Sequence, residues 1–558
     1  MSFIVEQDIE NAALEILHEL GYQIVYGPDI APDGQNPQRN GWDDVVLKTD
    51  LEDAIRRINK GVPDDAVEEA IKKVIRNASH HVITNNVRFH KFLTDGVEVE
   101  VRDKGRTKGF PIALFDFEHP ERNEFKAINQ FTIVEHGNRR PDILLFINGL
   151  PLGIIELKNP ASATATVKTA FDQIQVYLQE IPSLFAYNEL VIIADGTESK
   201  AGTLTSTWEW YMPWRTIDGS KREPKTLPQL EVMLKGMCDK SRILDIMKNF
   251  TGYQETKSGT VKVIAGYHQY HAANKAIEKT VKAIKGDKKV GVVWHTQGSG
   301  KSLTMAFYVA KLTMDARMDN PSIVLLTDRN DLDEQLFNTF SDYKQIFRED
   351  PQKIETQRDL KSSLKVASGG IFFTTIQKFS EKQGSQFETL STRSNIIVVA
   401  DEAHRTQYGL KGKVTKSNQL KYGFAKYLRD ALPNASFLGF TGTPIDLADK
   451  STRAIFGSYI DVYDMHTAIE DKRVVPIYYE SKLVKLGKNE DIFKQLDEDV
   501  EDVTELEERE SKEYLKTKWS TVEALVGTDK RIETIAQAIV RHFELKQATV
   551  DGKAIVVC

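Results

Sequence analysis

The stretch His295–Ser302 (HTQGSGKS) constrains this chain more than any other part of it. It lies between an apolar run at 290–294 and a helical pattern that begins near Ser302. A glycine-containing turn between a strand and a helix lets backbone N–H groups and the helix N-terminus surround phosphate groups. In such a loop Lys301 reaches the β- and γ-phosphates and the Ser302 hydroxyl binds Mg²⁺. The stretch therefore predicts a nucleotide-binding strand–loop–helix unit.

One position departs from the usual pattern of such loops. His295 stands where glycine is common, which leaves Gly298 and Gly300 to form the tight turn. The residues expected to contact the nucleotide are Thr296, Gly298, Ser299, Gly300, Lys301 and Ser302.

A second string, Asp401-Glu402-Ala403-His404, follows the apolar run at 395–400. Asp401 is then placed to contact Mg²⁺, and Glu402 to activate the attacking water. We also expect His404 to lie at the nucleotide. The two strings in this order predict a motor domain that hydrolyses ATP with Mg²⁺.

Strand and helix patterns alternate from about residue 260, which predicts an α/β domain with a parallel sheet. The expected strands lie near 290–295, 322–327, 370–374, 395–400 and 436–440. The expected divisions are a domain at 1–225, a linker at 226–259, the parallel-sheet domain at 260–460, a mostly helical connection at 461–550 with the acidic run 497–510, and the start of a further domain at 551–558.

Bulk composition restricts the class of protein. A chain of 558 residues is too long for one core, so roughly two to four domains are expected. Two cysteines exclude a disulfide scaffold and fit a reducing cytoplasm. No apolar run is long enough to span a membrane, and a net charge of −7 does not by itself indicate a nucleic-acid binder.

The N-terminal region contains a second group of chemically informative residues. We expect an amphipathic helix at 5–20, strand-rich sequence at 84–117, two strands within 142–158 and a helix at 167–181. Glu156 and Lys158 are two apart on a strand and share a face. A three-residue loop (148–150) would pair Ile147 with Pro151 and set Asp142 opposite Glu156, whereas a two-residue turn would not, so we predict the longer loop.

These residues suit metal-dependent phosphodiester cleavage. Asp142 and Glu156 can hold a hard divalent cation, preferably Mg²⁺, which activates a water molecule. Lys158 can position the nucleophile or stabilise developing negative charge. The alternative is a strand-start aspartate beside a surface ion pair, but charges on such an apolar strand favour a functional role.

Two helices offer additional candidates. Gln173 and Tyr177 are four apart and share one face of the helix at 167–181, where they can contact DNA or the catalytic strands. Glu6 and Glu10 on the first helix are further candidate metal ligands, or simply solvated acids.

Further motifs follow one another along the chain. They are residues 148–152 before Glu156-Leu157-Lys158, Gln173-x-x-x-Tyr177, 266–272 upstream of the phosphate loop, 295–302, 325–332, 373–379, 401–405 and 439–444. Together these motifs resemble the R subunits (motor and endonuclease) of type I restriction enzymes. The resemblance covers nearly the whole chain, and the motifs agree in identity, order and spacing.

The resemblance implies an N-terminal PD-(D/E)xK nuclease, a mixed sheet flanked by helices, followed by a RecA-like lobe of helicase superfamily 2. It implies ATP-dependent translocation on double-stranded DNA and cleavage of unmethylated foreign DNA, together with modification and specificity subunits. Gln269 would contact the adenine. Family members continue through a second RecA-like lobe, so the strand expected at 552–557 would open that lobe.

The sequence leaves two other hypotheses for the function. A free-standing helicase–nuclease for repair or phage defence would carry the same motifs without needing a methyltransferase. The other hypothesis is a catalytically inactive DNA-binding or scaffolding protein that keeps the fold. Such a protein would be free to lose its catalytic residues, and the presence of all six argues against it: Asp142, Glu156, Lys158, Lys301, Asp401 and Glu402.

Overall fold

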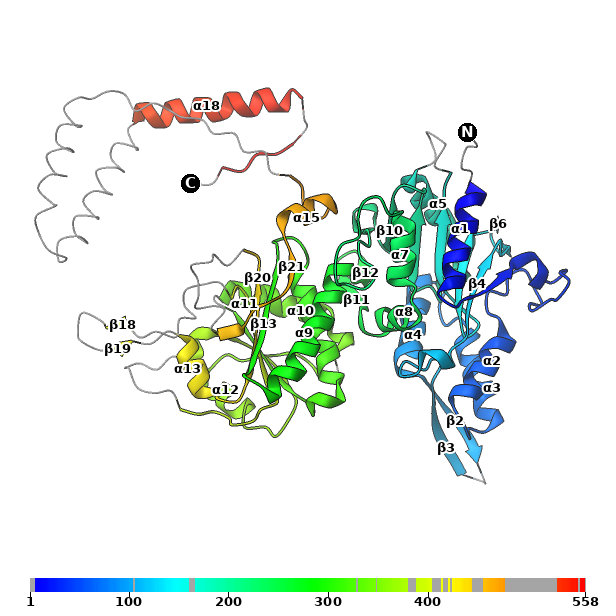
Figure 1. Ribbon diagram of the computed structural model, residues 1–558, viewed down its shortest axis with the longest axis horizontal. Coiled ribbons are helices and arrows are strands. Elements are labelled where there is room, and N and C mark those ends of the chain that lie inside the picture. Colours follow the sequence, from blue (N-terminus) through cyan, green and yellow to red (C-terminus); the bar gives the residue numbers. More distant parts are fainter. Residues whose placement is uncertain are drawn as a thin grey trace, which may run out of the picture. The chain divides into compact units, whose positions relative to one another are not determined.

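The computed structural model describes two compact units, within residues 1–475 and 476–558 (Figure 1). The described residues are 6–103, 106–159, 166–327, 330–347, 349–379, 388–403, 413–414, 420–421, 424–443, 455–476, 529–549 and 552–556. The acidic run expected at 497–510 lies outside them, as does His404.

The first unit begins with a mixed sheet, as predicted. Its strand order is β1-β4-β7-β8-β9-β10, with β1/β4 and β8/β9 parallel and the other neighbours antiparallel. The strands are β1 (Gln23–Tyr26), β4 (Phe125–Asn129), β7 (Ile143–Ile147), β8 (Leu150–Leu157), β9 (Leu190–Ala194) and β10 (Ser199–Gly202). Every residue of β7, β8 and β9 is buried, so a charged side chain on them is exceptional.

Helices pack on this sheet at the predicted places. Helix α1 (Glu6–Glu19) contacts β1 and β8, and α5 (Val167–Glu180) contacts β8 and β9 (Figure 1). The remaining elements of the region are α2 (Lys48–Ile58), α3 (Asp64–Ile75), α4 (Val82–Asp95), α6 (Pro182–Phe185), the hairpin β2 (Val97–Asp103) and β3 (Arg106–Ile112), and the short pair β5 (Ile133–Val134) and β6 (Asn138–Arg139).

The strand-rich reading of 84–117 was wrong in its first third. Residues 84–95 belong to α4, and only 97–112 form a β-hairpin. The residues that α4 buries, including Asn86, Phe89 and Leu93, are spaced by three and four, which is the helical period. The β-branched residues at the start of this segment obscured that period.

The stretch 226–259, expected to be a linker, is largely folded. It contains α7 (Gln229–Met237), α8 (Lys240–Asn249) and the first strand of the hairpin β11 (Thr251–Thr256) and β12 (Gly259–Ile264). Helix α7 buries six of its nine residues and contacts α1 and β10. This packing makes the stretch part of the folded body that includes the first sheet.

The second sheet is parallel throughout, as predicted. Its order is β15-β16-β14-β17-β20-β13-β21. The five expected strands are β13 (Lys289–His295), β14 (Ser322–Thr327), β16 (Ile371–Thr375), β17 (Ile396–Ala400) and β20 (Ser436–Thr441). Fully buried runs such as β14, β16 and β17 are typical of a parallel sheet covered on both faces.

Its helices and edges complete this region. The helices are α9 (Tyr267–Lys285), α10 (Lys301–Met314), α11 (Asn330–Asp342), α12 (Gln357–Ser363), α13 (Phe424–Ala431) and α15 (Met465–Glu470). The edge strands β15 (Gln352–Lys353) and β21 (Tyr459–Tyr463) were not predicted. Strand β21 pairs with β13 and crosses residue 460, where the domain was expected to end. The strand was not predicted because its mixed, half-exposed residues lack an apolar pattern.

A buried charged cluster joins the hairpin β11–β12 to the region of the first sheet. The Lys262 ammonium lies 2.7 Å from the Glu189 carboxylate, and both side chains are fully buried. His90 Nδ1 lies 3.0 Å from the same carboxylate oxygen. Lys262 also donates to Asn86 Oδ1 and to the Asn188 carbonyl. Burial lowers the pKa of Lys262, while the Glu189 carboxylate opposes that change.

Lys262→Ala is expected to lower the free energy of unfolding by about 3 kcal/mol, because it leaves the Glu189 charge buried with its main partner removed. Chemical denaturation of the wild-type and variant chains measures this. Lys257→Ala in the same hairpin, where the lysine is exposed, is the matched control and should change stability by less than about 0.5 kcal/mol. Equal effects of the two variants would contradict the role of the cluster.

The second unit contributes one helix to the described residues, α18 (Asp529–Gln547). Residues 552–556, expected to open a strand, have no regular secondary structure, and Ile555 is 90% exposed. A strand needs a neighbouring strand for its hydrogen bonds, which an apolar pattern alone does not supply. Across the described ranges, no helix has the length and apolar character needed to cross a bilayer.

Candidate functional site

The phosphate-type loop lies between β13 and α10, as predicted. Gly300 is the residue before α10 and adopts a left-handed conformation with φ 85°, and Gly298 has φ 79°. The positive φ of Gly300 favours glycine, and a Cβ atom there would lie 2.7 Å from Gln269 Nε2 and displace that side chain. The Ser299 hydroxyl donates to the Thr296 carbonyl at 2.6 Å and closes the turn.

Helix α9 holds this loop from one side. Gln269 Oε1 accepts from the Gly266 N–H at 2.9 Å, and its Nε2 donates to the Gly300 carbonyl at 3.1 Å. His268 Nε2 lies 2.9 Å from the Ser299 carbonyl, and burial lowers the pKa of His268 to about 3, which keeps the ring neutral. Gln269 therefore anchors the loop in this structure, and its contact with adenine stays a prediction.

His295 has a structural explanation. It is the last residue of β13, is fully buried, and its Nε2 lies 3.2 Å from Asp461 Oδ1 on β21. Lys275 on α9 approaches the other oxygen of Asp461 at 2.8 Å. His295, which stands where other such loops have glycine, therefore holds the edge strand β21 through Asp461. Asp461 was missed because β21 has no clear sequence pattern.

Lys301 and the acidic string come together. Lys301 Nζ lies 3.0 Å from Glu402 Oε1, although about a hundred residues separate them. Asp401 and Glu402 directly follow β17, and Glu402 adopts φ 49°, an uncommon left-handed conformation for a non-glycine residue. A Cβ atom at Gly442 would lie 2.9 Å from Lys301 Nζ, so the end of β20 also borders the lysine. Ser302 lies in the first turn of α10.

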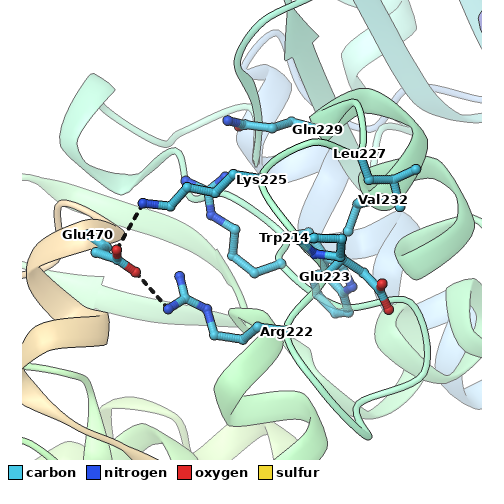
Figure 2. Close-up of a pocket in the computed structure, with 10 residues that line it drawn as sticks. Trp214, Arg222, Glu223, Lys225, Leu227, Gln229, Val232 and Glu470 are labelled. Carbon is cyan, nitrogen blue, oxygen red and sulfur yellow. Dashed lines mark hydrogen bonds and ion pairs between the residues drawn. The ribbon is translucent and has the colours of Figure 1, made fainter.

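The segment after β21, which contains α15 and Asp471, contacts both the phosphate-type loop and residues 212–225. Glu470 of α15 pairs with Arg222 at 2.8 Å and with Lys225 at 3.0 Å, in a pocket that Trp214 also lines (Figure 2). The neighbouring Asp471 accepts hydrogen bonds from the Tyr267 hydroxyl at 2.7 Å and the Tyr463 hydroxyl at 2.9 Å. The Tyr463 carbonyl in turn accepts from the Thr296 N–H, so α15 is tied to the phosphate loop.

The second candidate site depends on the turn between β7 and β8. The predicted three-residue loop was wrong, because Ile147 pairs with Leu150 across a two-residue turn. Asn148 and Gly149 have φ 52° and 77°, as a two-residue hairpin turn with this twist requires. Asn148 was also held by tertiary contacts that the sequence did not reveal, since its buried side chain bonds the Glu124 N–H and the Leu114 carbonyl.

A β-bulge nevertheless restores the predicted pairing. Phe146 pairs with Pro151 but Leu145 pairs with Gly153, so Leu152 is an extra residue in β8. The register then continues through Ile143↔Ile155, which brings Asp142 beside Glu156. The Leu157 N–H donates to Asp142 Oδ2 at 2.7 Å. The juxtaposition of the two carboxylates was therefore correct, although the predicted loop was not.

The two acids and Lys158 form one cluster, in which Glu156 is buried and Asp142 and Lys158 are half-buried. Lys158 Nζ lies 2.6 Å from Glu156 Oε1, and Glu156 is 2% exposed. The pKa of Asp142 is raised to about 8, mainly by burial and secondly by the charge of Glu156. Burial also raises the pKa of Glu156, although Lys158 opposes this. Two carboxylates that resist ionisation side by side are typical of a site that receives a cation.

The buried oxygens of this cluster fit a divalent metal ion. Glu156 Oε2 is buried and makes no hydrogen bond within 3.5 Å, although the Tyr177 hydroxyl lies close enough to lower the pKa of Glu156 as a donor. Asp142 and Glu156 supply hard oxygen ligands, which Mg²⁺ prefers. Within the described ranges, no group of three or more His, Cys, Asp or Glu residues is arranged to hold a metal ion.

The residues predicted on α5 and α1 lie around the cluster in different ways. Tyr177 is buried on α5, and its pKa is raised by burial and by the charges of Glu156 and Asp142, so its hydroxyl is near both acids. Gln173 lies one turn earlier and is half-buried. The charge of Glu6 also raises the pKa of Asp142 and Glu156. Glu10 is buried and bonded to Asn129 and Gln130.

Two family models match the chain and divide it in the order of the two sheets. Residues 3–210 match the family described as type I restriction enzyme R protein N terminus. Residues 268–513 match the family described as SWI2/SNF2 ATPase.

Relatives match over both regions at once. The chain is 40% identical over 564 residues to the type I restriction enzyme HindI endonuclease subunit of Haemophilus influenzae, covering 99% of this chain and 52% of the relative. It is 26% identical over 446 residues to the type I restriction enzyme SsaAORF53P endonuclease subunit of Staphylococcus saprophyticus, covering 78% of this chain and 42% of the relative. The chain thus spans about half the length of these relatives or less.

Solved structures are more distant. The ATP-dependent Type ISP restriction-modification enzyme LlaBIII bound to DNA matches 37% of this chain and 16% of its own at 14% identity, with a TM-score of 0.24, too low to define a shared arrangement. The N-terminal family model, the ATPase family model and the alignment along 99% of the chain agree with one another. The chain belongs to the family of type I restriction enzyme endonuclease (R) subunits.

Proposed function

We propose that the chain carries the DNA-cleaving centre and the first half of the ATP-driven motor of a type I restriction enzyme. In this proposal the first sheet is a PD-(D/E)xK nuclease and the second a RecA-like lobe of helicase superfamily 2. The observation that carries the nuclease assignment is the group of Asp142, Glu156 and Lys158, which meet where β7 begins and β8 ends, with the Glu156 side chain buried.

At the nuclease centre, Asp142 and Glu156 would hold Mg²⁺. The bound ion would supply an activated water and stabilise charge on the phosphate. Lys158, which is held against Glu156, would orient the nucleophile or stabilise the charge that develops on the scissile phosphate. Tyr177 would hold the acids from α5, and Gln173, one turn earlier, would contact the DNA.

At the motor centre, the loop at 296–302 would surround the phosphates of ATP. Lys301 would exchange its contact with Glu402 for the β- and γ-phosphates, which frees Glu402 to orient the attacking water. Ser302 and Asp401 would hold the Mg²⁺ that accompanies ATP, and Gln269 would keep the loop in place beside the base. His404 keeps its proposed place at the nucleotide.

The proposed partners are double-stranded DNA and the modification and specificity subunits, which recognise the site and its methylation. The complete enzyme would act in the cytoplasm. In this division of labour, the R subunit pulls in DNA and cuts it away from the recognition site.

The test of this function uses the complete R subunit with circular DNA, Mg²⁺ and ATP. The proposal predicts cutting of unmethylated DNA only, and only when the modification and specificity subunits are present. Cutting without these subunits and regardless of methylation would instead establish a free-standing helicase–nuclease.

A pH dependence follows from the high pKa of Asp142. Below pH 8 the Asp142 carboxyl is largely protonated, so Mg²⁺ must displace a proton to bind there. Binding of Mg²⁺ without nucleotide is expected to strengthen by up to about tenfold per pH unit between pH 6 and 8 and to release close to one proton. Calorimetric titration in two buffers of different ionisation enthalpy measures both.

The same group affects stability with a definite sign. The folded pKa of Asp142, about 8, lies above its ordinary value of 3.8, so the folded state binds more protons between these values. The metal-free protein should therefore lose stability as pH rises through this window, and Asp142→Asn should remove that contribution. For the binding prediction, Mg²⁺ affinity that is independent of pH between 6 and 8 would contradict the assignment of Asp142 as a metal ligand with a high pKa.

A further inference from the structure

Glu10 is a buried acid whose two oxygens are both occupied. It lies on α1, is 3% exposed, and accepts from Asn129 Nδ2 at 2.7 Å through Oε1. Its Oε2 accepts from Gln130 Nε2 at 3.0 Å. Both donors lie at the end of β4, the strand that pairs with β7. These contacts occupy one lone-pair direction of each oxygen and orient the carboxylate toward the chain that leaves β4.

That chain adopts an uncommon conformation. Gln130 has φ 56°, in the left-handed region that non-glycine residues rarely occupy. Its backbone N–H donates to the Asp142 carbonyl at 3.1 Å. The turn is also packed from the other side, since a Cβ atom at Gly27 would lie 2.6 Å from the Asn129 carbonyl oxygen. The conformation that places the Gln130 N–H on Asp142 is therefore held at both the side chain and the backbone.

Glu6 and Glu10 are four apart on α1, yet they relate to the acid pair differently. Glu6 is among the charges that act on Asp142, Glu156 and Lys158. The hydrogen bonds of Glu10 lead instead through Gln130 to the main chain of Asp142. Glu6 therefore acts on the cluster through its charge, whereas Glu10 bonds to the turn after β4.

We propose that Glu10 is a positioning residue of the nuclease centre, which holds Gln130 in its left-handed turn and thereby fixes the main chain of Asp142, and that it is not a metal ligand. This inference depends on the proposed nuclease function. It replaces the expectation that Glu10 binds the metal directly.

Glu10→Gln separates the two roles. Glutamine keeps the length and both polar ends, and one facing amide can turn so that its oxygen accepts from the new amide N–H. A positioning role then survives, whereas a ligand role loses its charge. The affinity of the 558-residue chain for Mn²⁺, measured calorimetrically without nucleotide, should change less than about threefold in Glu10→Gln. Asp142→Asn, the matched ligand variant, should lose measurable binding at this centre.

Glu10→Ala should reduce DNA cleavage by the complete enzyme about 10- to 100-fold, the usual effect of losing a group that orients a metal ligand. Gln130→Ala should cause a similar loss, and the double variant should be no worse than either, because both remove the same support. Thermal unfolding of each variant checks that the chain is folded.

The outcomes separate the inference from the function on which it depends. If Glu10→Gln loses Mn²⁺ affinity as Asp142→Asn does, Glu10 is a ligand and the inference is wrong. If the Glu10→Ala and Gln130→Ala losses multiply, the two residues act independently, and the proposed support through Gln130 is wrong. If Asp142→Asn itself retains Mn²⁺ binding and cleavage, the proposed nuclease centre is wrong, whatever Glu10 does.

Discussion

Lys158→Ala is expected to abolish DNA cleavage by the complete enzyme, by about a thousandfold or more, and to leave ATP hydrolysis unchanged. Lys158 is the cation closest to the proposed metal ligands, 2.6 Å from Glu156, and alanine has no group to orient the nucleophile or stabilise the phosphate. Lys158 follows strand β8 of the first sheet, whereas the residues proposed to bind ATP follow strands of the second. Conversion of supercoiled to linear DNA and release of phosphate measure the two activities.

The matched control for this variant is Lys72→Ala. Lys72 lies on α3 of the same region, is 70% exposed at its side chain, and pairs only loosely with Glu68 at 3.6 Å. Its removal should leave both activities near wild type. Loss of ATP hydrolysis in Lys158→Ala would show that the two centres are not divided as proposed.

Lys301→Ala is expected to abolish ATP hydrolysis, by about a thousandfold or more, and with it all ATP-dependent cleavage. The lysine follows the left-handed Gly300 at the start of α10 and lies 3.0 Å from Glu402, so in the proposed site it would lie between the ATP phosphates and the catalytic acid. DNA-stimulated phosphate release measures the effect. Lys282→Ala, an exposed lysine on α9, is the control and should retain hydrolysis.

Binding of a fluorescent ATP analogue refines this result. A variant that binds the analogue like the wild type but hydrolyses nothing would limit Lys301 to the chemical step. A Lys301→Ala enzyme that still hydrolyses ATP at the wild-type rate would show that the loop at 296–302 is not the site of ATP hydrolysis.

The motor centre was predictable because its information is local. The loop at 295–302 contains its own glycines and lies between an apolar strand and a helix, and the structure places β13 and α10 there. The acidic string likewise follows a recognisable buried strand, β17. The contact between Lys301 and Glu402 then follows from the parallel sheet, in which the carboxyl ends of the strands share one edge.

The nuclease centre was predictable only in part. Side-chain alternation placed Glu156 and Lys158 on one face, but the pairing of Asp142 with Glu156 depends on a bulge at Leu152. The sequence signals near that bulge, Pro151 and Gly153, do not determine how the register shifts. Two opposite errors, a loop one residue too long and an unforeseen bulge, gave the correct juxtaposition.

The contacts of Glu10 could not be read from the sequence at all. Asn129 and Gln130 lie more than a hundred residues from Glu10, and the positive φ of Gln130 has no glycine to signal it. The edge strand β21 was missed because its residues show no clear apolar pattern, and helix α4 was missed because β-branched residues near its start obscured its helical period.

The central claim is that cutting at one centre depends on ATP hydrolysis at another. The most direct test compares cleavage of unmethylated circular DNA by the complete enzyme with Mg²⁺ and ATP, and with Mg²⁺ and a non-hydrolysable ATP analogue. We expect linear product with ATP and none with the analogue. Equal cleavage under the two conditions would show that the nuclease works without the motor and would contradict the account.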